Sequence, residues 1–201
     1  MNLRTSRVMQ LYWALIAPLV KLDHQSIRHE LSSEEYRLFL SMSKIDQYHS
    51  FRVYQTVLRL LDGYESSDEC NHHRNTNFDT KHVSALKKAA LLHDIGRKDG
   101  DLPILQKVWV VVQDYQLKKK PASEQRAIKQ MIFETEQPPY RFTYYFHPQK
   151  SKKRLEQITD DATLLFLVEQ HHTSIEQLHS EGFSEIDVCL LQFLQRADEL
   201  N

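Results

Sequence analysis

Histidine and aspartate side chains recur along this sequence at positions where they could bind a metal ion. All but His147 stand on, or at the end of, an apolar segment with helical spacing, and His147 follows an aromatic run. The positions are His49, His93, Asp94, His147, His171, His172 and Asp198. Burying even a neutral polar group without a partner costs roughly 2 to 7 kcal/mol, so these side chains need compensation. A shared cation would remove that cost, and the inward faces of helical bundles are where such sites assemble. The sequence therefore predicts a metal site built from residues far apart in the chain.

The segment ALLHDIGR poses this problem most sharply, because it places His93 and Asp94 directly after an apolar run and just before Gly96. Adjacent side chains do not share one face of a regular helix, yet both can converge on one site at a fraying last turn. Asp94 could then bridge two ions. A ligand set of imidazoles and carboxylates without thiolates suits an octahedral or near-octahedral Mn, Fe, Ni, Co or Mg ion better than it suits a structural zinc ion.

Each of these positions, taken alone, has a plainer explanation. A single histidine on an apolar face is more often a hydrogen-bonded core residue than a ligand. An aspartate near a chain end is more often a helix cap or a surface charge. The metal interpretation depends on the whole set, because its histidines and carboxylates fall on different predicted helices or helix ends.

The composition is that of an ordinary globular chain, with no sign of a nucleic-acid or membrane partner. Among 201 residues, 26 Lys and Arg nearly balance 27 Asp and Glu, and 41% are hydrophobic. A net charge of -1 gives the protein no overall electrostatic attraction for phosphate. A phosphorylated substrate would therefore need a local cationic cluster or a metal ion. The early apolar run LYWALIAPLVKL contains Pro18 and is shorter than the roughly 20 residues of a membrane span. We interpret it as a core helix or, less favoured, a helix that contacts a partner.

The location expected from the sequence is the cytoplasm. Cys70 and Cys189 are too few for a disulfide framework or a thiolate zinc site, which favours a reducing compartment. The early apolar run also lacks the small-residue cleavage site of a signal peptide.

The predicted fold is all-α, because only four glycines occur and alternating strand patterns are scarce. Ser32 followed by Glu35 forms a capping-box pattern that begins one helix, and Ser184 begins the last. Further helices are expected over 6–22, over 46–61 with an end at Gly63, from Asp79 or Thr80 to an end at Gly96, and over 161–172.

Four segments carry less regular patterns. Residues 64–78 are polar and aperiodic, which predicts an exposed loop. Residues 102–117 fit either a strand or a buried helix, and their length favours the helix. Residues 118–126 fit a charged linker or a helix start, and residues 135–151 fit an aromatic loop with prolines, followed by a short helix near 152–158.

The ordered set of candidate ligands resembles the HD-domain superfamily of metal-dependent phosphohydrolases. The local sequences around these residues are similar as well. DQYHSFRV resembles the family's first-histidine helix, and ALLHDIGR resembles its His-Asp doublet. HPQKS and EQHHT resemble the segments with the extra histidines of the two-metal branch, and LQRADEL resembles the segment with the final aspartate. The resemblance covers residues 33–201 and leaves 1–32 as an N-terminal helical extension. It implies a single HD domain over 1–201, a helical bundle with the metal site in its core.

The resemblance also implies a role for each residue. The first ion would be held by His49, His93, Asp94 and Asp198, and the second by His147, His171 and bridging Asp94. His172 would be a further ligand or a phosphate contact. One or two divalent ions would supply a metal-activated hydroxide that attacks phosphorus. Arg97 stands where many members have Lys, and its guanidinium suits phosphate binding better than proton donation.

The implied activity is hydrolysis of a phosphomonoester or phosphodiester bond in a nucleotide or another small phosphorylated metabolite. Two alternatives stay open: a regulatory module that binds metal or nucleotide without turnover, and a di-iron oxygenase. No GYP follows His171 and His172, which disfavours a cyclic-di-GMP phosphodiesterase. No Glu-Asp doublet follows Asp94 as in enzymes that hydrolyse guanosine tetraphosphate. The exact substrate, the native metal and the oligomeric state are left open.

Overall fold

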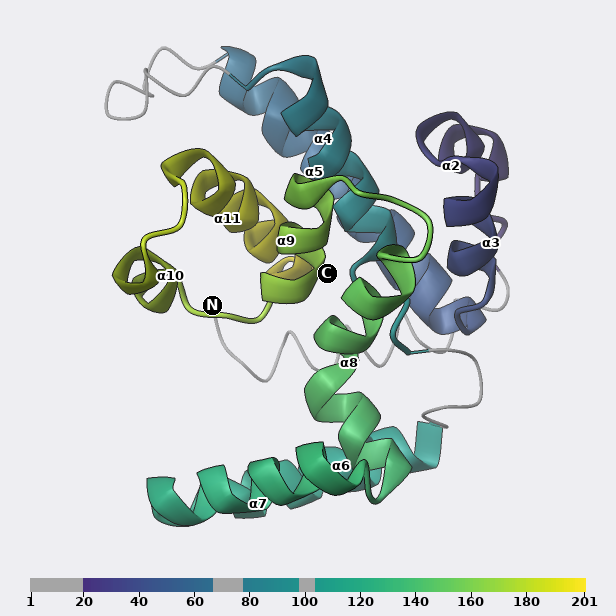
Figure 1. Cartoon of the computed structure of the whole chain (residues 1–201). Helices are drawn as coiled ribbons and strands as arrows, with labels where there is room; N and C mark the ends of the chain where they lie inside the picture. Colours follow the sequence, from purple (N-terminus) through teal and green to yellow (C-terminus); the bar gives the residue numbers. More distant parts are fainter. Residues whose placement is uncertain (1–19, 67–77, 98–103) are drawn as a thin grey trace.

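The computed structural model describes residues 20–66, 78–97 and 104–201, and within them the chain is all-α (Figure 1). No strand occurs in these ranges, which confirms the predicted fold class. The helices are α2 (His24–Glu30), α3 (Ser33–Leu40), α4 (Lys44–Ser66), α5 (Thr80–Leu92), α6 (Ile104–Leu117), α7 (Ala122–Thr135), α8 (Pro139–Leu155), α9 (Ala162–Gln170), α10 (Ile175–Glu181) and α11 (Glu185–Glu199).

The main bundle is formed by α4, α5, α9 and α11, which pack on one another around a leucine-rich core. Helices α2 and α3 cover α5, and the C-terminal part of α8 contributes Leu155 to the same core. Each fully buried leucine stabilises the fold by about 1.5 to 3 kcal/mol. The buried leucines at the centre are Leu86, Leu91, Leu164, Leu167, Leu190 and Leu194.

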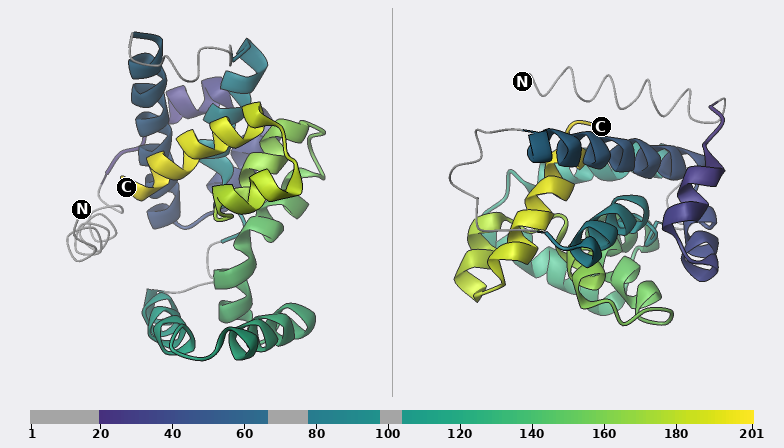
Figure 2. Two further views of the ribbon diagram at one scale, coloured as in Figure 1. Left: turned by 90° about the vertical axis from the view of Figure 1, so that its left-hand side faces the viewer. Right: turned by 90° about the horizontal axis from the view of Figure 1, so that it is seen from above.

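Helices α6 and α7 lie apart from this bundle and pack on the N-terminal part of α8 (Figures 1 and 2). Val110, Leu117 and Ile132 are buried there without belonging to the main core. Helix α8 therefore joins two packing regions, and a site between them has walls from both. Among the helices of the described ranges, none has the length and apolar character needed to cross a bilayer.

Several predicted helix starts are confirmed. The Ser32 backbone N–H donates to the Glu35 carboxylate at 2.7 Å, and the Glu35 N–H donates to the Ser32 hydroxyl at 3.2 Å, which completes the capping box of α3. Asp79 caps α5 by accepting the His82 N–H at 2.8 Å. Residues 104–117 form a helix, as their length favoured.

Three predicted boundaries are corrected. Helix α4 continues through Gly63 to Ser66, since a glycine in an exposed helix costs only about 1 kcal/mol and a longer helix tolerates it. The expected helix over 6–22 lies mostly outside the described residues; positions 20–22 are not helical, and α2 begins after Asp23. Of the expected loop over 64–78, residues 64–66 are helical and 67–77 lie outside the described part.

The aromatic segment 135–151 was expected to be a loop, and most of it is helix α8. Pro139 occupies a first-turn position, where its missing N–H costs nothing. Pro148 lies inside the helix and is accommodated by a kink at Phe146, whose backbone φ and ψ are -122° and 19°. The prolines therefore start and bend this helix instead of preventing it.

Candidate metal centre

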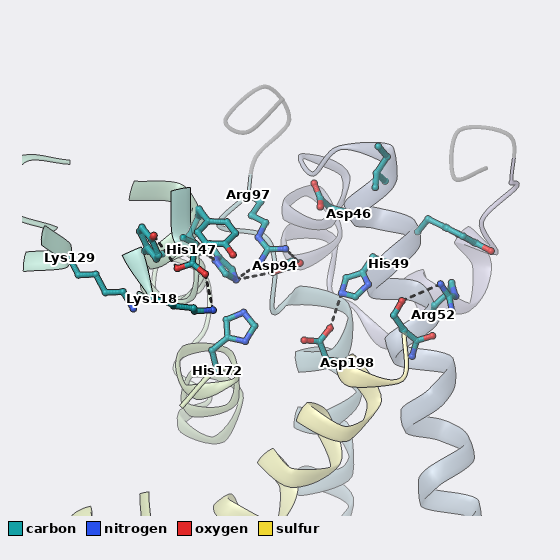
Figure 3. Close-up of a pocket in the computed structure, with 16 residues that line it drawn as sticks. Asp46, His49, Arg52, Asp94, Arg97, Lys118, Lys129, His147, His172 and Asp198 are labelled. Atoms are coloured by element: carbon teal, nitrogen blue, oxygen red, sulfur yellow. Dashed lines mark hydrogen bonds and ion pairs between the residues drawn. The ribbon is translucent and has the colours of Figure 1, made fainter. Parts of the chain in front are cut away.

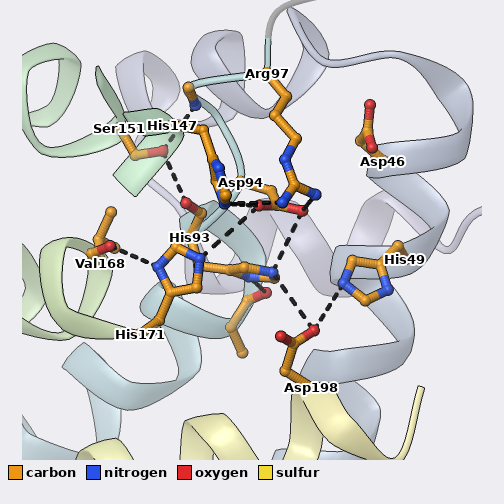
Figure 4. A network of polar contacts seen from close by, with 12 residues as sticks. Asp46, His49, His93, Asp94, Arg97, His147, Ser151, Val168, His171 and Asp198 are labelled. Atoms are coloured by element: carbon orange, nitrogen blue, oxygen red, sulfur yellow. Dashed lines mark hydrogen bonds and ion pairs between the residues drawn. The ribbon is translucent and has the colours of Figure 1, made fainter. Parts of the chain in front are cut away.

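The structure brings the predicted ligand residues together at the centre of the bundle (Figure 4). His49 comes from α4, His93 and Asp94 follow α5, His147 lies on α8, His171 follows α9, and Asp198 lies on α11. Their side chains form two groups that meet at Asp94. One contains His49, His93, Asp94 and Asp198; the other contains His147, His171 and His172.

The two oxygens of Asp94 face different groups. Oδ2 lies 3.6 Å from His93 Nε2, on the side of His49 and Asp198. Oδ1 lies 3.2 Å from His147 Nε2 and 4.0 Å from His171 Nε2. Asp94 is 1% exposed, so its charge has almost no access to water and depends on these neighbours.

The turn after α5 lets His93 and Asp94 point into one site. Helix α5 ends at Leu92, and the chain continues in turns in which the Arg97 N–H donates to the Asp94 carbonyl at 2.8 Å. Gly96 was expected to end the helix in a left-handed conformation, but among the described residues the only glycine with positive φ is Gly182. Gly96 is needed for a different reason. A Cβ there would lie 2.2 Å from the His147 carbonyl oxygen, so only glycine allows α8 to approach this closely.

Ser151 fixes that close approach between α8 and the turn. Its hydroxyl donates to the His93 carbonyl at 2.7 Å and accepts the Gly96 N–H at 2.7 Å. Arg154 also donates to the Ile95 carbonyl. These bonds hold the turn and the kinked helix in one arrangement, and so fix His147 relative to His93 and Asp94.

Backbone carbonyls set the tautomers of three histidines. The Nδ1 atoms of His93, His147 and His171 lie 3.1, 3.0 and 2.7 Å from the carbonyl oxygens of the residues three positions earlier. A carbonyl oxygen can only accept, so each Nδ1 carries the proton. In a neutral ring Nε2 then presents a lone pair, and all three Nε2 atoms face Asp94. This orientation is typical of metal-binding histidines.

Pro148 explains how the Tyr144 carbonyl becomes available to His147. In a regular helix that carbonyl would accept the N–H of residue 148, and proline has none. The His147 Nδ1–H takes its place at 3.0 Å. The proline in the HPQKS segment therefore has a structural reason to follow the histidine directly.

The pKa shifts of His147, His171 and Asp94 favour the charge states that a metal ion requires. Burial, together with the Arg97 charge, lowers the pKa of His147 to about 4. Burial and the neighbouring imidazole of His172 hold the pKa of His171 well below its usual value. Burial alone would raise the pKa of Asp94, but Arg97 and the imidazoles outweigh it and hold that pKa well below its usual range. Neutral imidazoles and an ionised carboxylate are ready to bind a cation.

His49 and Asp198 interact directly, with His49 Nε2 2.9 Å from Asp198 Oδ1. Burial would lower the pKa of His49, but the hydrogen bond and charge of Asp198 raise it overall. Burial would likewise raise the pKa of Asp198, and the hydrogen bond from His49 lowers it. This pair completes the group on the Oδ2 side of Asp94.

Unpaired buried atoms show that the two groups fit a cation. His93 Nε2, His171 Nε2 and Asp94 Oδ1 are buried and have no hydrogen-bond partner. The ligand atoms of His49, His93 and Asp94 all lie within 4.8 Å of one another, as do those of the second group. An ion about 2.1 Å from each ligand spaces them by no more than about 4.2 Å, so small movements suffice. Both groups could therefore hold a metal ion.

His171 and His172 differ in surroundings. His171 is 3% exposed and oriented by the Val168 carbonyl, in the same way as His93 and His147. The exposed His172 lines the adjoining cavity, with its ring centre 5.1 Å from that of His147. The geometry thus favours His171 as the inner ligand and places His172 where a bound molecule would meet it.

A cavity of about 770 Å³ opens from the candidate metal ligands to the surface (Figure 3). Four cationic side chains line it, Arg52, Arg97, Lys118 and Lys129, together with four aspartates, Asp46, Asp94, Asp114 and Asp198. Lys118 is paired with Asp114 at 2.8 Å. The sequence predicted only Arg97 of these cationic side chains. Residues 118–126, which contain Lys118, fitted a charged linker or a helix start, and no sequence pattern marked Arg52 or Lys129 as a binding residue. The lysines reach the cavity through the packing of α6 and α7 on α8, which leaves no pattern along the chain.

The fold and the site define an all-α bundle with a buried His/Asp cluster that could hold metal at the base of a cavity lined by both cationic and acidic side chains. Comparisons with protein-family models, curated proteins and solved structures found no match. The function of the site must therefore be inferred from its chemistry.

Replacement of Gly96 tests the packing that positions His147. We expect Gly96→Ala to destabilise the fold by about 1 to 3 kcal/mol, because the added Cβ meets a backbone oxygen and the turn or α8 must shift. Denaturant unfolding measures this change. Gly63→Ala is the matched control, since a Cβ there meets nothing within 4 Å. Equal stability of the two variants would contradict the close approach.

Replacement of Asp94 tests the metal site. Asp94→Asn keeps the shape of the side chain but removes the charge shared by both groups, so we expect it to abolish Mn²⁺ binding as measured by calorimetry and elemental analysis. His179→Ala, at an exposed position on α10, is expected to bind Mn²⁺ like the wild type. Wild-type affinity in the Asp94 variant would refute the assignment.

Proposed function

We propose that this protein is a metal-dependent phosphohydrolase of the HD-domain type, which cleaves a phosphomonoester or phosphodiester bond in a nucleotide or another small phosphorylated metabolite. The observation that carries the proposal is the position of Asp94, whose two oxygens face two histidine groups beside a cavity that Arg97 and three further cationic side chains line. Two ions on either side of one carboxylate are a recurring arrangement in phosphoryl-transfer sites.

The ligand assignment follows the two groups. The first ion would be held by His49, His93, Asp94 Oδ2 and Asp198, and the second by Asp94 Oδ1, His147 and His171. Divalent Mn, Fe, Ni, Co or Mg, when bound, would activate water and neutralise charge on the phosphoryl oxygens. The backbone carbonyls behind the imidazoles hold the ligands in the orientation this requires.

The cationic side chains of the cavity are suited to bind the phosphate. Arg97 offers a planar pair of guanidinium donors, so it suits binding of phosphoryl oxygens better than proton donation. Lys129 supplies further positive charge from α7, as does Lys118, which follows α6 and is paired with Asp114 at 2.8 Å. A chain with a net charge of -1 would otherwise offer no attraction for an anion.

The size and lining of the cavity support a small substrate. About 770 Å³ is within the range of pockets for metabolites and nucleotides. Tyr48, Tyr144 and Tyr145 line it as well, and aromatic rings of this kind suit a nucleobase. A cytoplasmic location, which the two cysteines favour, belongs to the same proposal.

The proposal is tested by turnover with metal-reconstituted protein. We expect the Mn²⁺-loaded chain to hydrolyse p-nitrophenyl phosphate, its bis ester, or a member of a nucleotide and sugar-phosphate panel. Asp198→Asn should lower kcat by at least about 100-fold, the scale set by loss of general acid–base or metal catalysis. Lys120→Ala, an exposed position paired only locally with Glu124, is the control and should retain wild-type kcat.

Two outcomes would overturn the proposal. Metal-loaded protein that binds a nucleotide without turning over any phosphate ester would favour the regulatory module. Metal-loaded protein that consumes O₂ in the reduced di-iron form would favour the oxygenase.

A further inference from the structure

The Arg97 guanidinium spans the two ligand groups (Figure 4). One terminal nitrogen, Nη1, donates to Asp94 Oδ2 at 2.6 Å, and the other, Nη2, donates to His147 Nε2 at 2.8 Å. Arg97 follows Asp94 by three residues on the turn that carries the doublet, and its backbone N–H is bonded to the Asp94 carbonyl. The turn therefore holds the guanidinium beside both acceptors.

The contact with His147 excludes an ion at the same atom. The Nδ1–H of His147 is bonded to the Tyr144 carbonyl, so Nε2 has a single lone pair and Arg97 uses it. A second ion that takes His147 as a ligand must first displace the guanidinium. The positive charge of Arg97 also repels a cation at that distance.

The first group is affected less. Arg97 also donates to Asp94 Oδ2, but a carboxylate oxygen keeps a further lone pair for an ion. His49 Nε2 is bonded within the group to Asp198 Oδ1, and His93 Nε2 has no hydrogen-bond partner.

A displaced Arg97 has a place to go, because its side chain already lines the cavity. It is 22% exposed, so movement toward the cavity takes it into a more hydrated space. Leaving Asp94 and His147 costs Arg97 its two acceptors. A phosphate group replaces both, since its oxygens accept from the two terminal nitrogens of one guanidinium.

We propose that Arg97 blocks the second ion position until a phosphate group in the cavity draws its guanidinium away, so that phosphate and the second divalent ion bind cooperatively. This regulation rests on the proposed function for its physiological substrate, but its two binding events are measurable without turnover. By thermodynamic reciprocity, the factor by which phosphate strengthens the second ion equals the factor by which that ion strengthens phosphate.

The test is calorimetric titration of Mn²⁺ into the metal-free full chain, with and without inorganic phosphate. For the wild type we expect one ion to bind without phosphate, and the second to gain about 5- to 150-fold in affinity when phosphate is present, the usual range for coupled sites. Arg97→Met should bind the second ion in the absence of phosphate at least about 5-fold more tightly than the wild type. Elemental analysis after gel filtration counts the bound ions.

Two further variants separate contact from charge. Arg52→Met removes an equal charge from the same cavity, at a guanidinium that donates to the Asn201 carbonyl at 3.5 Å, and it should leave second-ion affinity without phosphate at the wild-type value. Arg97→Lys keeps the charge but cannot donate to both acceptors through a planar fork, so it should give an affinity between those of the wild type and Arg97→Met. Thermal unfolding confirms that each variant is folded.

The outcomes are distinct. Equal second-ion affinity in Arg97→Met and the wild type would overturn the proposal, as would an equal increase in Arg52→Met, because the effect would then be charge alone. One ion in Arg97→Met under all conditions would refute the second position itself. A second ion that depends on Arg97 and phosphate, in a protein that hydrolyses no phosphate ester, would support this inference while refuting the proposed function.

Discussion

Three backbone carbonyl oxygens determine the chemistry of this site, because each accepts a histidine Nδ1–H and leaves the opposite nitrogen as a lone pair. The rings of His93, His147 and His171 are thereby aimed at Asp94 from three helices. Arg97 donates to Asp94 Oδ2 and His147 Nε2, but hydrogen bonding within the cluster does not satisfy the buried His93 Nε2, His171 Nε2 and Asp94 Oδ1. A cation can, which is why the arrangement points to metal more strongly than the residue types do.

Helix α8 connects this centre to the rest of the molecule. Its Pro148 frees the carbonyl that orients His147, and its Ser151 binds the turn that carries the doublet. Its N-terminal part supports α6 and α7, which bring Lys118 and Lys129 to the cavity. One kinked helix thus couples the ligand geometry to the cationic wall, so a change in its packing would affect both.

Much of the candidate site was predictable because its residue types are unusual in apolar surroundings. The ligand residues were identified as a set, and their convergence around Asp94 agrees with that prediction. The roles of glycine and proline were harder to predict. Gly96 was expected to end a helix and instead permits a close backbone contact, while the prolines of 135–151 start and bend a helix. The local sequence shows which backbone conformations and contacts a glycine or a proline allows. The packing of the helices decides which of them occurs.

The sequence by itself determined the helical class, the caps of α3 and α5, and which side chains are candidate ligands, because propensity, capping and burial cost act over a few residues. Only the tertiary structure decided which ring nitrogen faces inward, that Arg97 spans Asp94 and His147, and that lysines from α6 and α7 line the cavity. Those features depend on contacts between residues tens of positions apart. Their geometry is set when the helices pack, and no spacing along the chain encodes it.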